Sequence, residues 1–381
     1  MSNKSKNPKG GLINVYKAKG LSSRQVLNKL KKILNTNKLG HVGTLDPFAD
    51  GVLPVAIGQA TKVIRFMEGY SKSYRVLINF GEATTTQDLS GEIAFDIPIS
   101  NEKLQEITAD DFKLLKDKAQ ELSGNLTQTV PEYSAIKFQG KPLYWYARRG
   151  IQVPRKSREV RVNELKFLAA GVNEAALEKD IPLSLENLKA HANAEYQALE
   201  EFFPNMQIID TGLDAVNPDL KLPKLWAIFD LDVSSGTYIR TWADDLAESL
   251  GIAGYALALR RLRTGPFKLE NSFSLAKIEE ERQEKPDLDL DYQSKNYDFL
   301  LNPALSRPDL PLLSINKENA LKLLHGQRAK LANISRENPK FRVFYKDLFL
   351  GFAQLNESKE GPELKAERMF VTVEYFNDRF Q

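Results

Sequence analysis

The sequence predicts an α+β protein, because segments with strand periodicity and segments with helix periodicity are mixed along the chain. Residues 75–81 form an apolar run that ends in a glycine, which indicates a buried strand. Residues 226–233 alternate apolar and polar side chains, which is typical of a half-buried strand. A helix is then expected from Ile239 to Leu250, where apolar residues recur on one face, and Gly251 ends it. The length of 381 residues suggests two or three domains.

A basic helix is predicted near the N-terminus. Ser22 and Gln25 have the spacing of a capping box, and apolar residues from Val26 to Leu34 then fall on one helical face. The rest of the surface carries three lysines: Lys29, Lys31 and Lys32. These lysines could contact phosphates or could simply face solvent, and the pattern favours neither.

Composition narrows the class of protein. Hydrophobic residues make up 42% and charged residues 27%, which is typical of a soluble globular protein. No apolar run approaches the roughly 18 residues that a membrane span needs. Residues 1–10 are polar and basic, so we expect a disordered arm rather than a secretory signal, and a cytoplasmic protein. With no cysteines and three scattered histidines, we expect no disulfide and no metal site.

Charge is unevenly distributed along the chain. Residues 1–75 hold fourteen Lys and Arg against three acids, whereas residues 171–232 hold twelve acids against four lysines. Segregated charge of this kind favours a polyanion-binding face and a separate acidic surface.

One short loop concentrates residues that restrict the backbone. Gly40, Gly43 and Gly51 permit close approach of a ligand or a left-handed backbone, and Pro47 stiffens the turn around Asp46. Aspartate is common in such turns because it hydrogen-bonds its own backbone, so a structural role is the simpler interpretation of the isolated residue.

The complete stretch from residue 40 to 54 decides between these interpretations. It closely resembles the catalytic loop of the TruB family of tRNA pseudouridine synthases, G-H-x-G-T-L-D-P-x-A-x-G-x-L-P. Four further segments resemble the family: residues 80–91 (F-G-x-x-T-x-T-x-D-x-x-G), 134–137 (S-A-I-K), 234–240 and 259–267. One departure is Val130 before Pro131, where the family usually has two prolines.

The resemblance implies a domain organisation. We expect a catalytic domain over residues 11–275 around a mixed, largely antiparallel sheet, with an acidic insert at about 166–225. A linker at 276–299 would lead to a small β-rich domain at 300–381 that resembles a PUA RNA-binding domain. In that domain we expect a helix at 317–324 and strands near 341–345, 348–354 and 369–375.

The resemblance also implies a function. The family isomerises uridine to pseudouridine at position 55 in the T loop of tRNA after flipping the base, and needs no cofactor or metal. Asp46 would be the nucleophile and Arg240 its charge partner, while Tyr74 would contact the flipped base. The remaining substrate-binding residues would be His41, Gly43, Thr44, Leu45, Lys19, Lys72, Lys137 and Leu259.

Two other functions stay open from the sequence. The chain could be an RNA-binding folding factor that uses the same cleft, or a synthase that depends on a guide RNA. The partner in the leading interpretation is tRNA alone, and a monomer is expected.

Overall fold

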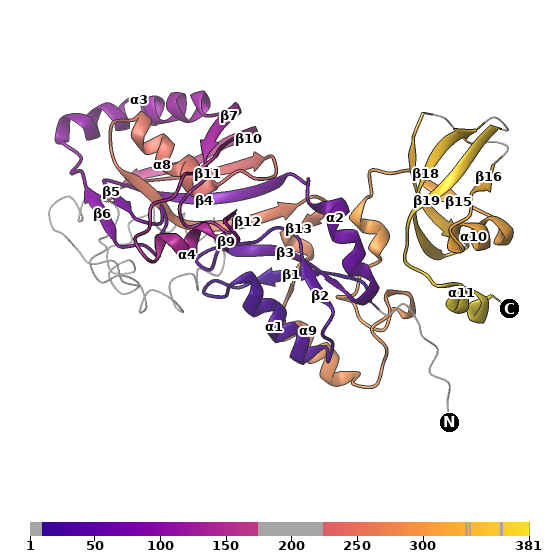
Figure 1. Cartoon of the computed structure of the whole chain (residues 1–381). Coiled ribbons are helices and arrows are strands. Elements are labelled where there is room, and N and C mark those ends of the chain that lie inside the picture. The colour runs from indigo at the N-terminus through magenta and orange to yellow at the C-terminus, as the bar shows by residue number, and fades with distance from the viewer. Residues whose placement is uncertain (1–9, 174–223, 332–333, 335–336, 359–360, 381) are drawn as a thin grey trace.

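The computed structural model describes residues 10–173, 224–331, 334, 337–358 and 361–380, and in this part the chain forms a large and a small β-rich unit (Figure 1). The large unit contains β1 (Leu12–Lys17), β2 (Leu39–His41), β3 (Asp50–Ile57), β4 (Lys72–Phe80), β5 (Glu82–Thr84), β6 (Ile93–Asp96), β7 (Gly124–Thr129), β8 (Lys137–Phe138), β9 (Lys141–Pro142), β10 (Ser157–Val172), β11 (Leu225–Val233), β12 (Gly254–Thr264), β13 (Phe267–Lys268) and β14 (Phe273–Ser274). Its helices are α1 (Ser23–Ile33), α2 (Ile64–Met67), α3 (Asn101–Glu121), α4 (Leu143–Ala147), α8 (Ile239–Ser249) and α9 (Leu275–Glu284), with the short 3-10 helices η1 (Gly58–Val63) and η2 (Leu269–Asn271).

The small unit follows two more 3-10 helices, η3 (Tyr292–Ser294) and η4 (Pro303–Ser306). It contains β15 (Leu312–Ser314), α10 (Lys317–Leu324), β16 (Ala329–Lys330), β17 (Lys340–Tyr345), β18 (Leu348–Ser358), β19 (Gly361–Met369) and α11 (Val373–Arg379). Its five strands form one sheet in the order β15-β17-β18-β19-β16.

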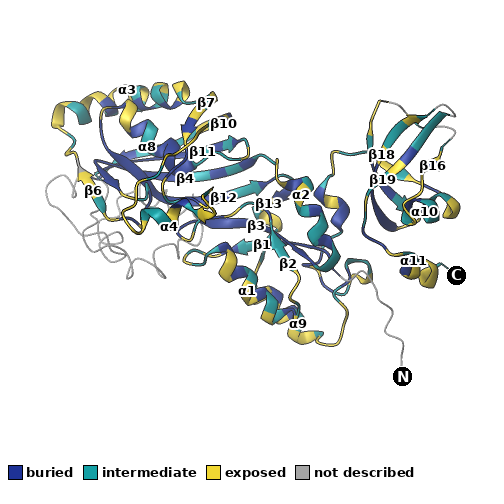
Figure 2. Cartoon of the chain, viewed as in Figure 1, coloured by how far each residue is buried: buried dark blue, intermediate teal, exposed yellow. Residues whose placement is uncertain are grey.

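A ten-stranded sheet organises the large unit. Its order is β14-β1-β3-β12-β4-β11-β10-β7, with β2 paired to β3 and β13 to β12. Only the pairs β1–β14 and β3–β12 are parallel, so the expected mixed, largely antiparallel sheet is confirmed. The central strands are the most deeply buried part of the unit (Figure 2). Helix α8 packs on this sheet through Trp242, whose ring contacts Phe229 of β11.

The strongest sequence patterns are confirmed. Ser22 caps α1, its side chain accepts the N–H of Gln25, and the capping box is complete. Helix α8 ends before Gly251, which adopts a left-handed backbone. Strand β11 is half-buried only from Asp230 onward. Its first five residues are buried on both faces, because apolar side chains on each side join the main core.

One predicted strand is wrong. The segment at 369–375 was expected to be a strand, but β19 ends at Met369 and α11 begins at Val373. Thr372 caps this helix by accepting the N–H of Tyr375, and Phe376 packs against Tyr345 of β17. The apolar residues of this segment are therefore buried from a helix and not from a strand.

The segment expected to be a linker is packed at several residues and exposed at most of the others. Ile278 in α9 is buried together with Tyr297 and Phe299 in a cluster that also contains Val26 and Leu30 of α1. Part of the predicted linker thus belongs to the core of the large unit, and the domain boundaries remain a prediction.

The two units share a hydrophobic core. Phe349, Phe352 and Phe370 of the small unit are buried in one cluster with Val63 and Met67 of the large unit. Polar contacts also hold the segment that connects the units against the large unit. Tyr70 donates to the carbonyl of Ser306, and the backbones of Leu12 and Leu301 exchange two hydrogen bonds.

Two predicted features lie outside the described residues: most of the basic arm (1–9) and residues 174–223 of the acidic insert. Residues 166–172 of the predicted insert belong to β10, and Leu225 begins β11. Among the described helices, none has the length and apolarity that crossing a membrane would require.

Candidate active site

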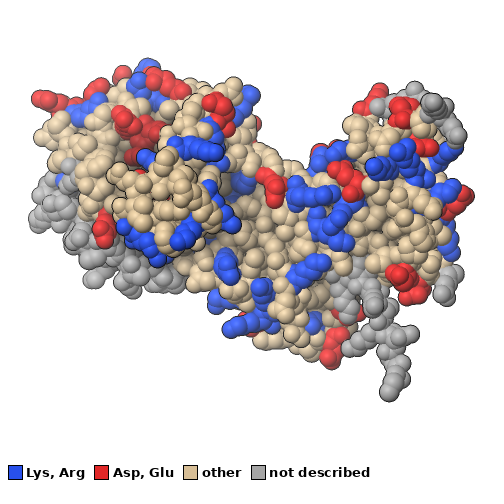
Figure 3. All heavy atoms as spheres, in the orientation of Figure 1, with Lys and Arg blue, Asp and Glu red and all other residues tan. Residues whose placement is uncertain are grey.

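A cavity of about 350 Å³ opens beside the loop that carries Asp46. It is lined by Gly43, Thr44, Leu45, Asp46, Lys72, Tyr74, Ser134, Ala135, Ile136, Arg158, Ser235, Gly236, Thr237, Tyr238, Ile239, Arg240 and Leu259. The lining therefore comes from six separate stretches of chain that the large sheet brings together. In the face shown in Figure 3, Lys and Arg side chains gather in the hollow where the two units meet.

The turn between β1 and α1 holds the aspartate loop through its backbone. The amine of Lys17 donates to the carbonyl of Ala49 at 2.6 Å, and the N–H of Gly20 donates to the carbonyl of Pro47 at 2.7 Å. Ser23 spans the backbone of Leu45, because its hydroxyl accepts the Leu45 N–H and donates to the Leu45 carbonyl. These contacts fix the loop without using any of its side chains.

Lys17 is buried among carbonyl oxygens. Its amine also donates to the carbonyls of Ala18 and Leu21, so three acceptors match the three N–H groups of the protonated form. Burial lowers the pKa of Lys17 to about 7, and the charge of Asp50 opposes that effect.

Arg261 of β12 holds the same loop from the opposite side. Its guanidinium is fully buried and donates to the carbonyls of Val52, Gly43 and Thr44. Gly51 makes this approach possible. Its φ is +108°, and a Cβ at this position would lie 2.3 Å from the carbonyl oxygen of Arg261.

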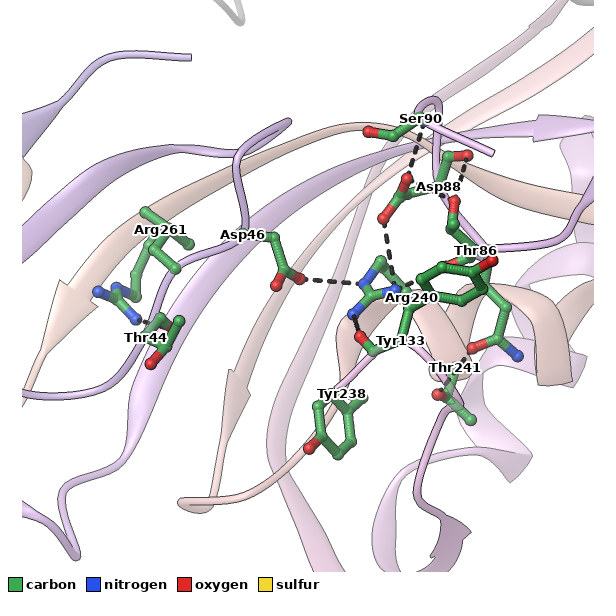
Figure 4. Close-up of polar contacts among 12 residues, drawn as sticks. Thr44, Asp46, Thr86, Asp88, Ser90, Tyr133, Tyr238, Arg240, Thr241 and Arg261 are labelled. Carbon is green, nitrogen blue, oxygen red and sulfur yellow. Dashed lines mark hydrogen bonds and ion pairs between the residues drawn. The ribbon is translucent and has the colours of Figure 1, made fainter. Parts of the chain in front are cut away.

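Arg240 lies between two carboxylates (Figure 4). Its Nε donates to Asp46 Oδ2 at 3.0 Å, and its Nη1 lies 3.4 Å from Asp88 Oδ2. The remaining donors reach the carbonyls of Thr86 at 2.6 Å and Tyr133 at 3.0 Å. The Arg240 side chain is 3% exposed and that of Asp88 is 7% exposed, whereas that of Asp46 is 36% exposed. Asp46 is therefore the carboxylate that a ligand in the cavity can reach.

Asp88 is buried behind Arg240. Burial raises the pKa of the Asp88 carboxyl, while the Arg240 charge and hydrogen bonds from Thr86 and the Ser90 N–H lower it. The two carboxylates and one guanidinium leave a net negative charge at this point, and the guanidinium is held in one position by four acceptors.

The backbone before α8 places Arg240. Helix α8 has Tyr238 as its N-cap, and that residue makes no side-chain cap. Instead the buried amide of Gln128 in β7 accepts the Tyr238 N–H at 3.0 Å and donates to the Tyr238 carbonyl at 3.1 Å. This pair of bonds fixes the first turn of the helix, two residues before Arg240.

Tyr74 and Leu259 form an apolar wall of the cavity. Both are buried, and they lie on the adjacent strands β4 and β12. Lys72 lines the same cavity, and its amine donates to the carbonyl of Tyr70 at 2.9 Å. Burial, and to a smaller extent the charge of Arg261, lowers the pKa of Lys72 to about 8.

The cavity brings together most of the residues that the sequence singled out. Asp46, Tyr74, Arg240, Gly43, Thr44, Leu45, Lys72 and Leu259 all line it. Three expected substrate-binding residues lie outside its lining: His41, Lys19 and Lys137. His41 ends strand β2, where burial lowers its pKa and its Nδ1 has no hydrogen-bond partner in the part of the chain that the structure describes. Lys137 is exposed in β8.

Sequence reasoning missed three charged residues of the site: Asp88, Arg261 and Arg158. Asp88 lies in the T-x-T-x-D stretch and Arg261 in the 259–267 segment, so both were in matched motifs but carried no assigned role. For Arg158 only the basic composition near it gave a signal. Within the described ranges, no group of three or more His, Asp or Glu residues could hold a metal ion.

Known proteins resemble this chain over the part that carries the Asp46 loop. A family model described as "TruB family pseudouridylate synthase (N terminal domain)" matches residues 31–182. The tRNA pseudouridine synthase B of Streptococcus agalactiae serotype III is 30% identical over 361 residues, or 95% of this chain and 99% of the relative. The enzyme of the same name from Listeria innocua serovar 6a is 33% identical over 316 residues, or 83% of each chain.

Solved structures share the fold. A chain of an H/ACA ribonucleoprotein bound to a substrate RNA containing 2'-deoxyuridine superimposes with a TM-score of 0.57 at 20% identity, covering 96% of this chain and 86% of that chain. A chain of a Cbf5-Nop10-Gar1 complex gives the same TM-score and coverage at 21% identity.

Proposed function

The chain belongs to the TruB family of pseudouridylate synthases, and we propose that it converts uridine 55 in the T loop of tRNA to pseudouridine, with Asp46 as nucleophile and without a cofactor. The observation that carries this proposal is the ion pair between Asp46 and Arg240 in the wall of the cavity. A carboxylate that is partly exposed, oriented and paired can attack a substrate that enters there.

The reaction needs no external reagent. The bond from ribose C1′ to N1 of uracil breaks, the base turns, and a bond from C1′ to C5 forms. The hydrogen on C5 leaves as a proton and N1 takes up a proton, so the atoms balance. The proposal leaves three first steps open for Asp46: attack on C1′, attack on the base, or removal of a ribose proton.

The neighbouring residues suit this chemistry. Arg240 places a positive charge within hydrogen-bonding distance of Asp46 and so stabilises a carboxylate there when substrate displaces water. Tyr74 offers a ring for stacking on the flipped base and a hydroxyl for proton transfer at C5. Leu259 helps to exclude water from the same space. The small unit would then act as a PUA-like domain that binds another part of the tRNA.

Release of tritium from tRNA labelled at C5 of uridine tests the proposal, because C5 loses its hydrogen. Asp46→Asn should abolish release while tRNA affinity stays within a few-fold of wild type. Asp230→Asn is the matched control, because this carboxylate pairs with Arg75 and does not line the cavity. Turnover by Asp46→Asn would contradict the nucleophile assignment.

The same assay separates the two alternatives. Purified protein and unmodified tRNA, with no guide RNA, should suffice, and EDTA should not inhibit. A folding factor would bind tRNA without releasing tritium. A guide-dependent synthase would release tritium only when guide RNA is added.

A further inference from the structure

One side of the cavity carries two cations that form no salt bridge within the described residues: Lys72 and Arg158. Lys72 has only neutral partners there, the carbonyl of Tyr70 and the hydroxyl of Ser235 at 3.5 Å. The Arg158 guanidinium lies over the ring of Tyr238, with its carbon 4.6 Å from the ring centroid. Its Nε is buried and has no hydrogen-bond partner among the residues that the structure describes. A buried donor of this kind is costly, so Arg158 is a guanidinium with unused hydrogen-bonding capacity beside the cavity.

Arg158 is held in place before any ligand binds. It pairs in register with Gln128, the residue that clamps the backbone of Tyr238, so β7 and β10 fix both the guanidinium and the ring beneath it. Gly236 leaves the necessary space. Its φ is +98°, and a Cβ there would lie 2.9 Å from Nη1 of Arg158. A pre-organised guanidinium loses little entropy when it binds an anion.

We propose that Arg158, together with Lys72, binds a phosphate next to the flipped uridine and thereby sets the position of its ribose against Asp46. This inference rests on the proposed function. A nucleotide that enters the cavity brings two phosphates to its mouth, and a planar guanidinium is well suited to a phosphate. Charge also favours this assignment, because Asp46 and Asp88 already share Arg240, whereas Lys72 and Arg158 form no salt bridge with an acid among the described residues. Arg158 is a positioning residue in this scheme.

The test measures binding of a T-stem-loop RNA that carries one methylphosphonate, on the 5′ or the 3′ side of the target uridine. A methylphosphonate removes the charge of a single phosphate. All RNAs, including the reference with ordinary phosphates, carry 2′-deoxy sugars before both positions, so that the strand is stable. Binding is measured in the Asp46→Asn background to prevent turnover.

In this background one of the two methylphosphonates should weaken binding about tenfold to a hundredfold, the range for a hydrogen bond to a charged group. Adding Arg158→Ala should weaken binding of the reference RNA by a similar factor and reduce the methylphosphonate effect to less than about threefold. The position that responds identifies the phosphate. Arg158→Lys keeps the positive charge and the fold but loses the planar guanidinium, so it should retain part of the methylphosphonate effect.

Arg161→Ala is the matched control. Arg161 lies on the same strand but is exposed on the opposite face, and it is not part of the cavity. Arg161→Ala removes one positive charge, as Arg158→Ala does, but it removes that charge from outside the cavity. It should therefore leave the methylphosphonate effect intact. The inference is overturned if neither methylphosphonate weakens binding, or if the effect is equally large with and without Arg158. Tritium release by the wild-type protein reports separately on the proposed function.

Discussion

Replacing Arg240 by alanine should destabilise the protein by about 3–5 kcal/mol, the usual cost of removing one partner of a buried ion pair. Most of this cost should come from Asp88, which is 7% exposed and would remain as a buried carboxylate without its cation. Asp46 should contribute less, because it is 36% exposed and water screens it. The carbonyls of Thr86 and Tyr133 would lose a donor as well.

Urea unfolding of the Arg240→Ala and Asp88→Asn variants and of the double variant measures this division. Asparagine keeps an oxygen that can accept from Thr86 and from the Ser90 N–H, and removes only the charge. The double variant should therefore be at least about 1 kcal/mol more stable than the sum of the two single losses predicts. Additive losses would refute the argument that the unpaired Asp88 charge dominates.

The same variant has a defined pH dependence. Burial raises the Asp88 pKa and the Arg240 charge opposes this, so removing Arg240 should raise the pKa further. A carboxyl whose pKa is higher in the folded than in the unfolded state destabilises the fold when it is ionised, and this loss disappears as pH falls and the proton binds. The destabilisation by Arg240→Ala should thus be smaller at pH 5 than at pH 8, and an equal loss at both would contradict the assignment.

Three further predictions follow from other parts of the structure. Phe352→Ala should cost about 3–5 kcal/mol in urea unfolding, because its ring is fully buried between the two units. A loss below about 1 kcal/mol would mean that this core does not stabilise the protein. Burial, with a smaller contribution from the charge of Arg261, lowers the pKa of Lys72 to about 8. Wild-type affinity for RNA should therefore fall as pH rises from 7 to 9, and Lys72→Met should show a smaller fall, measured by fluorescence anisotropy. Identical pH profiles would remove Lys72 from the binding site. Gly51→Ala should lower the melting temperature and tritium release together, because a Cβ there collides with the Arg261 carbonyl. Unchanged release would show that the close approach of β3 and β12 is not needed.

Short sequence patterns correctly predicted the elements that depend on residues close together in the sequence. The capping box at Ser22 and the apolar face of α8 depend on residues three or four positions apart, and both are present. The strand predicted at 369–375 was wrong because Thr372 acts as a helix cap and Phe376 contacts a strand that is distant in the sequence. A single apolar run does not distinguish these outcomes.

The residues of the candidate site also divide into those that the local sequence predicted and those whose role depends on distant contacts. The loop around Asp46 could be recognised from consecutive residues, and so could the segment that ends in Arg240. The role of Asp88 could not be recognised in this way, because its contact with Arg240 joins residues more than 150 positions apart. Likewise, nothing in the sequence near Lys17 shows that its amine would bind the carbonyl of Ala49. Such contacts depend on the pairing of whole strands.

The aromatic core between the two units has a mechanical consequence. Phe349, Phe352 and Phe370 are packed against the large unit, so any swing of the small unit would open a cavity and expose these rings to water. Cores of this kind transmit strain and do not slide freely. The cavity beside Asp46 and the small unit are therefore kept at a set spacing. If both contact tRNA as proposed, an RNA whose loop and distal helix are separated by a different distance will contact one of them but not both at once.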